Sequence, residues 1–360
     1  MVRALWIGLL ALAWMAASPA AADSRLFSDE APLKLVITGP FPSLVRAAKT
    51  STNPYPATLS VSDGAGAATT LPIQITARGL TRRTAGYCAF PPLALIFDKT
   101  KAHGTLFHGQ HRLKLVTYCR NQDDYEQRVV LEYLGYKLYN LITPMSFRAR
   151  AAEVTYRKDE TDAGVTRFGF LLEDIDDVAE RNHKAKLTAA TRQISPAQLD
   201  AHAAVRGTLF EFMISNLDWE FLAGPAGVDC CHNSRFIAAK GATPATASAI
   251  VPVPYDWDYS GFVDSPYAGP PEGIRSVSRT TDRFYRGYCV TTGEVPSVIE
   301  EYRAHRAEMM AVINGEPRLK ANFRSKAARF IDGFFTLLDD PERVQSQIVK
   351  HCRQGTLSSD

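Results

Sequence analysis

The order of strand-like and helix-like segments most constrains what this chain of 360 residues can fold into. Its first half contains short apolar stretches rich in β-branched and aromatic residues, separated by Gly, Pro and Asp turns. Further along, apolar residues recur at helical spacing. The predicted strands are 33–37, 57–61, 71–78, 93–97, 112–117, 153–157 and 167–172, and the predicted later helices are 196–215, 296–314 and 321–338. Segregated elements of this kind predict an α+β fold.

One helix interrupts the strands. It begins at Asp123, where Glu126 completes the D-x-x-E pattern of a capping box, and its apolar spacing continues to about Asn140. After the last strand, residues 173–177 form an acidic connector. We therefore divide the chain into a β-rich part, 23–172, the connector, a mostly helical part, 178–345, and a C-terminal tail, 346–360.

The N-terminus has the pattern of a secretory signal peptide. Arg3 precedes an apolar run at 4–17, and Ser18 and Pro19 end the run before three alanines at 20–22. The alternative is a membrane anchor, but the run is shorter than the roughly 20 residues a spanning helix needs. We expect residues 1–22 to be cleaved, no integral membrane span afterwards, and an exported protein, periplasmic or secreted.

Six cysteines are present, an even number that predicts disulfides in an exported chain. Cys88 and Cys119 lie on either side of a predicted strand pair and form our preferred first bridge. Cys230, Cys231 and His232 offer an alternative as part of a metal site, although adjacent cysteines lack the usual C-x2-C spacing.

The charge balance argues against nucleic acid as a partner. The chain has 41 basic and 38 acidic residues, a net charge of +3, and no basic tract. Proteins that bind nucleic acid usually concentrate positive charge on one face or segment.

Three polar motifs interrupt the apolar second half. They place Asp218 at a helix end, Asn233 after His232, and Asp256 two residues before Asp258. Phosphoryl transfer uses these residue types: one carboxylate orients the acceptor hydroxyl, and an amide oxygen and a carboxylate hold Mg²⁺. The alternatives are a solvent-facing helix end for Asp218 and turn residues for the others. Asp-x-Asp also recurs in metal-dependent glycosyltransferases.

The three motifs together resemble the conserved string of the CotH-like atypical protein kinases. That resemblance rests on Leu217-Asp218-Trp219, on His232-Asn233, and on Pro254-Tyr255-Asp256-Trp257-Asp258. It implies a two-lobed, protein-kinase-like fold, with a β-rich N-lobe carrying one main helix and a mostly helical C-lobe. It also implies that Asp218 is catalytic, and that Asn233, Asp256 and Asp258 bind Mg or Mn.

The same resemblance implies ATP or a related nucleotide as cofactor, and a protein acceptor or envelope partner. The acidic connector then takes the place of a hinge, with Glu173 and Asp174 binding the nucleotide. The sequence also departs from the pattern. Thr76-Ala77-Arg78-Gly79 lacks the family's Asn after R-G, and no glycine-rich loop is present to cover phosphates.

Strand alternation selects a lysine for the nucleotide. Lys114 shares one strand face with Arg112 and Val116, opposite two leucines that would pack inward. Glu132 lies on the early helix among apolar neighbours, where a carboxylate needs a partner. Because Glu126 is assigned to the cap, we predict a Lys114–Glu132 ion pair facing the cleft. The alternative places both side chains on the surface.

These observations favour an exported CotH-like kinase that transfers phosphate, or another nucleotide-derived group, to a protein acceptor. A kinase-fold protein that binds a ligand or envelope partner without catalysis is the first alternative. A metal-dependent glycosyltransferase that uses Asp256 and Asp258 is the second.

Overall fold

The structure is a computed structural model, and it describes residues 25–62, 68–84, 86–271 and 274–355. The predicted signal peptide, residues 1–22, lies outside the described residues. No helix in the described part of the chain combines the length and apolar character that crossing a membrane requires.

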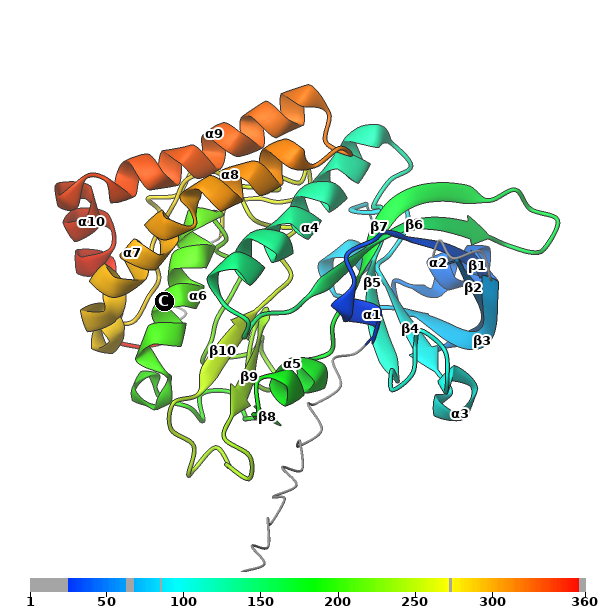
Figure 1. Cartoon of the computed structure of the whole chain (residues 1–360), viewed down its shortest axis with the longest axis horizontal. Helices are drawn as coiled ribbons and strands as arrows, with labels where there is room; N and C mark the ends of the chain where they lie inside the picture. Colours follow the sequence, from blue (N-terminus) through cyan, green and yellow to red (C-terminus); the bar gives the residue numbers. More distant parts are fainter. Residues whose placement is uncertain (1–24, 63–67, 85, 272–273, 356–360) are drawn as a thin grey trace, which may run out of the picture.

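Seven strands close into a barrel, on the right in Figure 1, in the order β1-β2-β3-β4-β5-β7-β6. Every neighbouring pair is antiparallel except β1 and β6, which close the barrel in parallel with Leu33 opposite Ala152. The strands are β1 (Leu33–Thr38), β2 (Tyr55–Ser62), β3 (Ala68–Ala77), β4 (Leu93–Phe97), β5 (Arg112–Val116), β6 (Ala149–Arg157) and β7 (Val165–Leu172).

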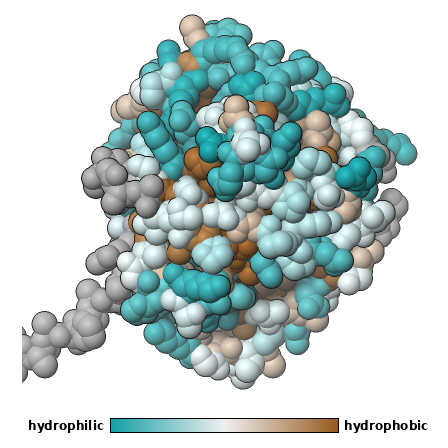
Figure 2. Space-filling model, turned by 90° about the vertical axis from the view of Figure 1, so that its right-hand side faces the viewer, coloured by the Kyte–Doolittle hydropathy of each residue, from teal (hydrophilic) through white to brown (hydrophobic). Residues whose placement is uncertain are grey.

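Alternating side chains fill the barrel, because successive residues of a strand point to opposite faces. In β1, Leu33, Leu35 and Ile37 are buried whereas Lys34 is exposed. Three short helices lie at the barrel, namely α1 (Arg25–Ser28), α2 (Phe41–Ala47) and α3 (Lys99–Ala102), and a 3-10 turn, η1 (Thr81–Arg83), follows β3. The barrel side of the surface is mainly hydrophilic, with smaller apolar areas towards its centre (Figure 2).

The long helix α4 (Asp123–Ile142) runs between the barrel and the later helices (Figure 1). It contacts β7 on one side and α8 on the other. Gly135 allows Trp257 to lie against the helix, since a Cβ at this position would come within 3.0 Å of the indole ring. The loop that carries Asp256 and Asp258 is therefore packed directly onto α4.

The rest of the chain combines a small sheet with helices. The sheet has the order β10-β9-β8 and is antiparallel. Its strands are β8 (Ala185–Leu187), β9 (Ser234–Ala238) and β10 (Val251–Pro254). The helices are α5 (Ile175–Arg181), α6 (Ala201–Met213), α7 (Val295–Ala304), α8 (Arg306–Gly315), α9 (Ala321–Leu338) and α10 (Pro341–Gln347), with 3-10 turns η2 (Pro196–Gln198), η3 (Cys289–Glu294) and η4 (Val349–His351).

The predicted two-lobed, kinase-like fold is wrong. The strands of the first half close into a seven-stranded barrel, the second half contains a sheet of its own, and helices make up only 36% of the structure. The closure could not be read from the sequence, because it pairs β1 with β6 more than a hundred residues later, and strand periodicity does not specify partners.

The predicted capping box is also wrong. The helix begins at Asp123, but Gln122 is its N-cap residue and makes no side-chain cap. The Glu126 carboxylate instead accepts a hydrogen bond from the Phe168 amide at 2.6 Å and forms an ion pair with Arg167 at 3.1 Å. Glu126 therefore ties α4 to β7.

Three disulfides are present, and among the described residues no cysteine is free. The predicted Cys88–Cys119 bridge is confirmed, with a Cα separation of 4.7 Å. The other bridges join Cys230 to Cys231 and Cys289 to Cys352. Since zinc is bound by free thiolates, the alternative metal site at Cys230 and Cys231 is excluded in this form of the protein.

Candidate functional site

A cavity of about 600 Å³, here called the charged cavity, lies between the barrel and the second half of the chain. It contains five of the side chains predicted from the sequence, namely Lys114, Asp218, Asn233, Asp256 and Asp258. Its other lining residues with acidic or basic side chains are Arg78, Arg82, Arg112, Lys186, Asp229, His232 and Arg235. The fold thus brings together three motifs that are far apart in the sequence.

The Asp218 turn is fixed by a buried network at the end of α6. The Asp218 amide donates to Asn216 Oδ1 at 3.1 Å, and Asn216 Nδ2 donates to Glu211 Oε2 at 2.8 Å. Glu211 is fully buried and also accepts a bond from Trp257 Nε1 at 3.2 Å. Burial raises the pKa of Glu211 to about 8. One carboxyl group therefore links the turn that carries Asp218 to the loop that carries Asp256.

The Asp218 carboxylate is held by the motif that contains Asn233. Its Oδ1 lies 2.7 Å from His232 Nε2, and Asn233 Nδ2 donates to its Oδ2 at 3.1 Å and to its backbone carbonyl at 2.6 Å. Burial alone lowers the pKa of His232, but the hydrogen bond and charge of Asp218 raise it above its usual value. The pair is therefore a carboxylate and an imidazole that readily takes a proton.

Asn233 and Asp256 both have left-handed backbone conformations, with φ of 50° and 70°. Among residues with a Cβ, Asn and Asp tolerate this region best, and such strain clusters at functional sites. The Asp256 amide donates to Tyr136 Oη at 2.9 Å. Among the described residues, neither the Asp256 carboxylate nor Asn233 Oδ1 takes part in a hydrogen bond, so both oxygen groups are available to a ligand.

Asp258 and Arg82, which line the charged cavity, also border a smaller void of about 10 Å³ together with Glu132. Asp258 is 9% exposed and accepts a hydrogen bond from Tyr267 Oη at 2.9 Å. Burial, followed by the charge of Asp256, raises the pKa of Asp258 to about 7. Burial and the charges of Asp258 and Asp256 also raise the pKa of Glu132 well above its usual value.

Lys114 lines the charged cavity, but the predicted Lys114–Glu132 ion pair is wrong. Lys114 Nζ lies 3.7 Å from the centre of the Tyr255 ring, and no ion pair joins it to Glu132 in the described structure. Helix α4 instead carries Glu132 to Arg82 and Asp258. Burial and the nearby Arg78 and Arg235 lower the pKa of Lys114 to about 7.

Two other cations share this wall of the cavity. Arg78 directly follows β3, and its Nε is buried without a hydrogen bond among the described residues. Arg235 on β9 donates from Nη1 to the Ser234 carbonyl at 2.8 Å, and its guanidinium lies 5.2 Å from the Tyr255 ring centre. Arg78, Lys114 and Arg235 therefore bring three positive charges to one wall of the cavity, which suits an anion.

Arg235 and Arg82 line the cavity but belong to none of the site motifs predicted from the sequence. Arg235 comes two residues after Asn233, so a strand starting directly after that motif would carry it along the cavity wall. Arg82 belongs to the short basic loop after β3 and donates from Nη2 to the Thr117 carbonyl at 2.6 Å. For Arg235, its position two residues after Asn233 could have indicated a place in the site. For Arg82, the only such indication was the positive charge of its loop.

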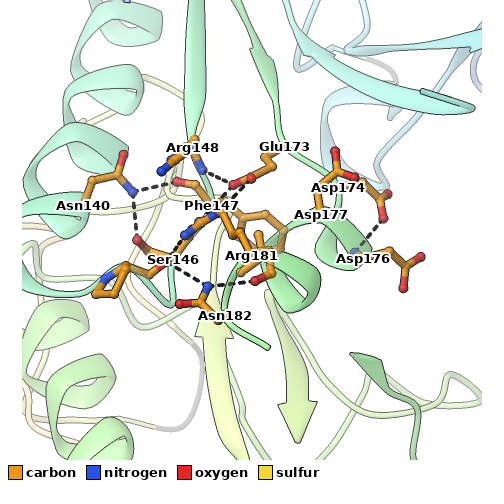
Figure 3. Close-up of polar contacts among 12 residues, drawn as sticks. Asn140, Ser146, Phe147, Arg148, Glu173, Asp174, Asp176, Asp177, Arg181 and Asn182 are labelled. Carbon is orange, nitrogen blue, oxygen red and sulfur yellow. Dashed lines mark hydrogen bonds and ion pairs between the residues drawn. The ribbon is translucent and has the colours of Figure 1, made fainter. Parts of the chain in front are cut away.

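Glu173 and Asp174 do not line the charged cavity. Figure 3 shows them on the connector, near Arg181 and Asp176. Glu173 is buried and accepts bonds from Arg181 Nε at 2.9 Å, Arg181 Nη2 at 3.1 Å and the Arg148 amide at 2.8 Å. Asp174 is the N-cap of α5 and accepts a bond from the Asp176 amide at 3.0 Å. Both carboxylates are thus committed to holding the connector between β7 and α5.

A scan against models of protein families finds none that matches this sequence, and a search of curated proteins finds no matching relative. In the described part of the chain, no three His, Cys, Asp or Glu side chains are grouped so that they could hold a metal ion by themselves.

Proposed function

We propose that this protein is an exported phosphotransferase that binds a nucleotide in the charged cavity and transfers its terminal phosphoryl group to a protein hydroxyl. One observation carries the proposal: Asp218, Asn233 and Asp256 line the same cavity as Arg78, Lys114 and Arg235. Carboxylate and amide oxygens beside a cluster of cations suit a phosphate group together with a divalent cation.

The cation cluster supports an anionic ligand. Without an anion, Arg78 and Arg235 repel a protonated Lys114, and this repulsion contributes to its lowered pKa. A polyphosphate would offset that repulsion and accept charge-assisted hydrogen bonds from guanidinium and ammonium groups. We therefore expect a negatively charged ligand to neutralise the positive charge of this cluster.

The oxygen groups suit Mg²⁺ or Mn²⁺. Asn233 Oδ1 and the Asp256 carboxylate have no hydrogen-bond partner among the described residues, and they would hold the ion. Magnesium is commonly bound by one or two protein carboxylates together with waters and substrate phosphates, so a protein-only cluster of three ligands is not required. When bound, the ion would neutralise negative charge on the phosphates.

Asp218 is suited to orient the acceptor. Its carboxylate would accept the proton of the acceptor hydroxyl while the new oxygen–phosphorus bond forms and the bond to the departing nucleoside diphosphate breaks. His232 Nε2 and Asn233 Nδ2 fix the two carboxylate oxygens, at 2.7 Å and 3.1 Å, and so keep this group in one orientation.

The resemblance to CotH-like kinases supports this proposal only through the residue types of the three motifs, because the predicted kinase-like fold is wrong. Export to the periplasm or outside the cell is part of the proposal. Three disulfides support it, because such bonds persist in oxidising compartments.

A transfer assay tests the proposal. Wild-type protein is incubated with γ-phosphate-labelled ATP or GTP, Mg²⁺ or Mn²⁺, and dephosphorylated casein as a general acceptor. We expect labelled protein with wild type and none with Asp218→Asn, while Asp218→Asn still binds the nucleotide. Nucleotide binding without transfer to any acceptor would favour a non-catalytic protein. In a parallel assay with a nucleotide-sugar in place of ATP or GTP, transfer of the sugar would favour a glycosyltransferase.

A further inference from the structure

A second cavity, of about 370 Å³, shares Asp218 and Tyr259 with the charged cavity. We call it the tyrosine cavity, because Tyr87, Tyr259 and Tyr267 line it together with Pro270 and Pro271. Asp218 is therefore exposed to two neighbouring spaces of different character. One is lined by cations, and the other has Asp218 as its only charged lining residue in the described part of the chain.

Most polar side chains of the tyrosine cavity are already committed. Ser215 Oγ donates to the carbonyls of Thr280 and Asp282 at 2.7 and 2.8 Å, and Thr280 Oγ1 lies 3.2 Å from Asp264 Oδ1. Tyr267 Oη donates to Asp258. What the cavity offers a ligand is therefore mainly ring surface, with the Asp218 carboxylate at its border.

The tyrosine rings form a connected surface. Tyr267 lies 5.7 Å from Tyr259 and 6.4 Å from Tyr87, measured between ring centroids. Tyr87 is 37% exposed, so this surface reaches the outside of the molecule. Leu80 and Val228 are likewise exposed and line the neighbouring charged cavity. Apolar contact is thus available along the rim of both cavities.

We propose that the tyrosine cavity is the acceptor subsite, and that it takes an uncharged, extended peptide. A Ser or Thr of the peptide would place its hydroxyl at Asp218, and an adjacent proline or other apolar side chain would lie on the tyrosine rings. Grooves lined by aromatic residues bind proline-containing segments in this way, and the peptide then loses little conformational freedom. This inference rests on the proposed function.

A sugar acceptor is disfavoured by the same observations. A sugar ring displays several hydroxyl groups, each of which needs a hydrogen-bond partner when it leaves water. The hydroxyls of Ser215, Thr280 and Tyr267 already have partners within the protein. An acidic peptide is disfavoured as well, because its carboxylates would lie beside Asp218 without a cation in this cavity.

Peptide binding is tested with an uncharged, end-capped nine-residue peptide that has Ser-Pro at its centre. Calorimetric titration measures its affinity for wild type, for Tyr87→Ala and for Val290→Ala, a control that removes exposed apolar surface outside both cavities. We expect Tyr87→Ala to weaken binding about tenfold, as is common when a contact aromatic is truncated, and Val290→Ala to leave it unchanged. Mg²⁺-nucleotide affinity should be equal in all three.

A second variant and a second ligand sharpen the test. Pro270→Asp places a carboxylate in the tyrosine cavity and should lower the affinity for the peptide at least as much as Tyr87→Ala does. Equal peptide affinity of wild type and both variants, or binding of methyl glucoside in place of the peptide, overturns the inference while leaving nucleotide binding intact. If the peptide binds as expected but no nucleotide binds, the peptide site stands and the phosphotransferase proposal falls.

Discussion

The connector and the charged cavity are both polar regions between the two halves of the chain, yet their polar groups are used differently. In the connector, Glu173 is buried and bound by Arg181 and by the Arg148 amide (Figure 3). In the cavity, the Asp256 carboxylate has no hydrogen-bond partner among the described residues, and Lys114 faces two other cations. Glu173 in the connector thus has its partners within the protein, whereas Asp256 and Lys114 in the cavity would gain partners from a ligand.

The largest effect on stability is expected in the connector. Glu173→Ala leaves the Arg181 guanidinium buried without its ion-pair partner, which should lower the free energy of unfolding by about 3–5 kcal/mol. Asp176→Ala is the control, because its 3.8 Å pair with Lys186 is exposed and such pairs contribute at most about 1 kcal/mol. Denaturant unfolding measures both. If Glu173→Ala lowers the free energy of unfolding no more than Asp176→Ala does, the Glu173–Arg181 pair does not stabilise the fold as proposed.

A smaller loss of stability is expected at Glu211. Glu211→Ala leaves the Asn216 and Trp257 donors without an acceptor, at a cost of about 2–3 kcal/mol. Because Trp257 is next to Asp256, we also expect weaker nucleotide binding. Glu211→Gln keeps the shape of the side chain but only one of its two acceptor oxygens, so it can satisfy one of the two donors and should restore about half of both losses. If Gln restores neither, the network does not position the two loops.

The pH dependence of stability gives an independent check on Glu211. Its folded pKa of about 8 lies above the usual value of 4.5, so the folded state holds a proton that the unfolded state releases. This contribution to stability is fully present below about pH 4.5 and is lost as the pH rises towards 8. Glu211→Gln should remove that part of the decline in thermal unfolding temperature. An identical pH profile for wild type and Glu211→Gln would contradict the raised pKa.

The smallest of these effects concerns ligand affinity at Lys114. A pKa of about 7 means that Lys114 is charged below neutrality and loses its proton above it. Nucleotide affinity should therefore decline with rising pH by up to about tenfold per unit above 7, relative to Lys114→Met measured in the same buffers. The variant supplies the reference for the titration of the phosphates themselves. Parallel pH profiles for the two proteins would exclude contact between Lys114 and the phosphates.

Much of the local structure could be predicted from the sequence, and the architecture could not. Strand alternation placed Lys114 on the cavity side of β5, and the three polar motifs do line one cavity. Barrel closure depends on which distant strands pair, as β1 and β6 do, and periodicity carries no such information. The same limit explains Glu132, whose apolar sequence neighbours show that the carboxylate needs a partner but not that Arg82 is near it. It also explains Glu173, whose acidic sequence neighbours do not reveal its ion pair with Arg181.

The most direct test of the central claim is calorimetric titration of ATP, with and without Mg²⁺, into wild type, Asp256→Ala and Asp229→Ala. Asp229 is an exposed carboxylate that lines the same cavity and has no role in the proposal. We predict Mg²⁺-dependent binding by wild type and Asp229→Ala, and loss of the Mg²⁺-dependent part in Asp256→Ala with its fold intact. Equal binding by wild type and Asp256→Ala, or no nucleotide binding by wild type, would contradict the account.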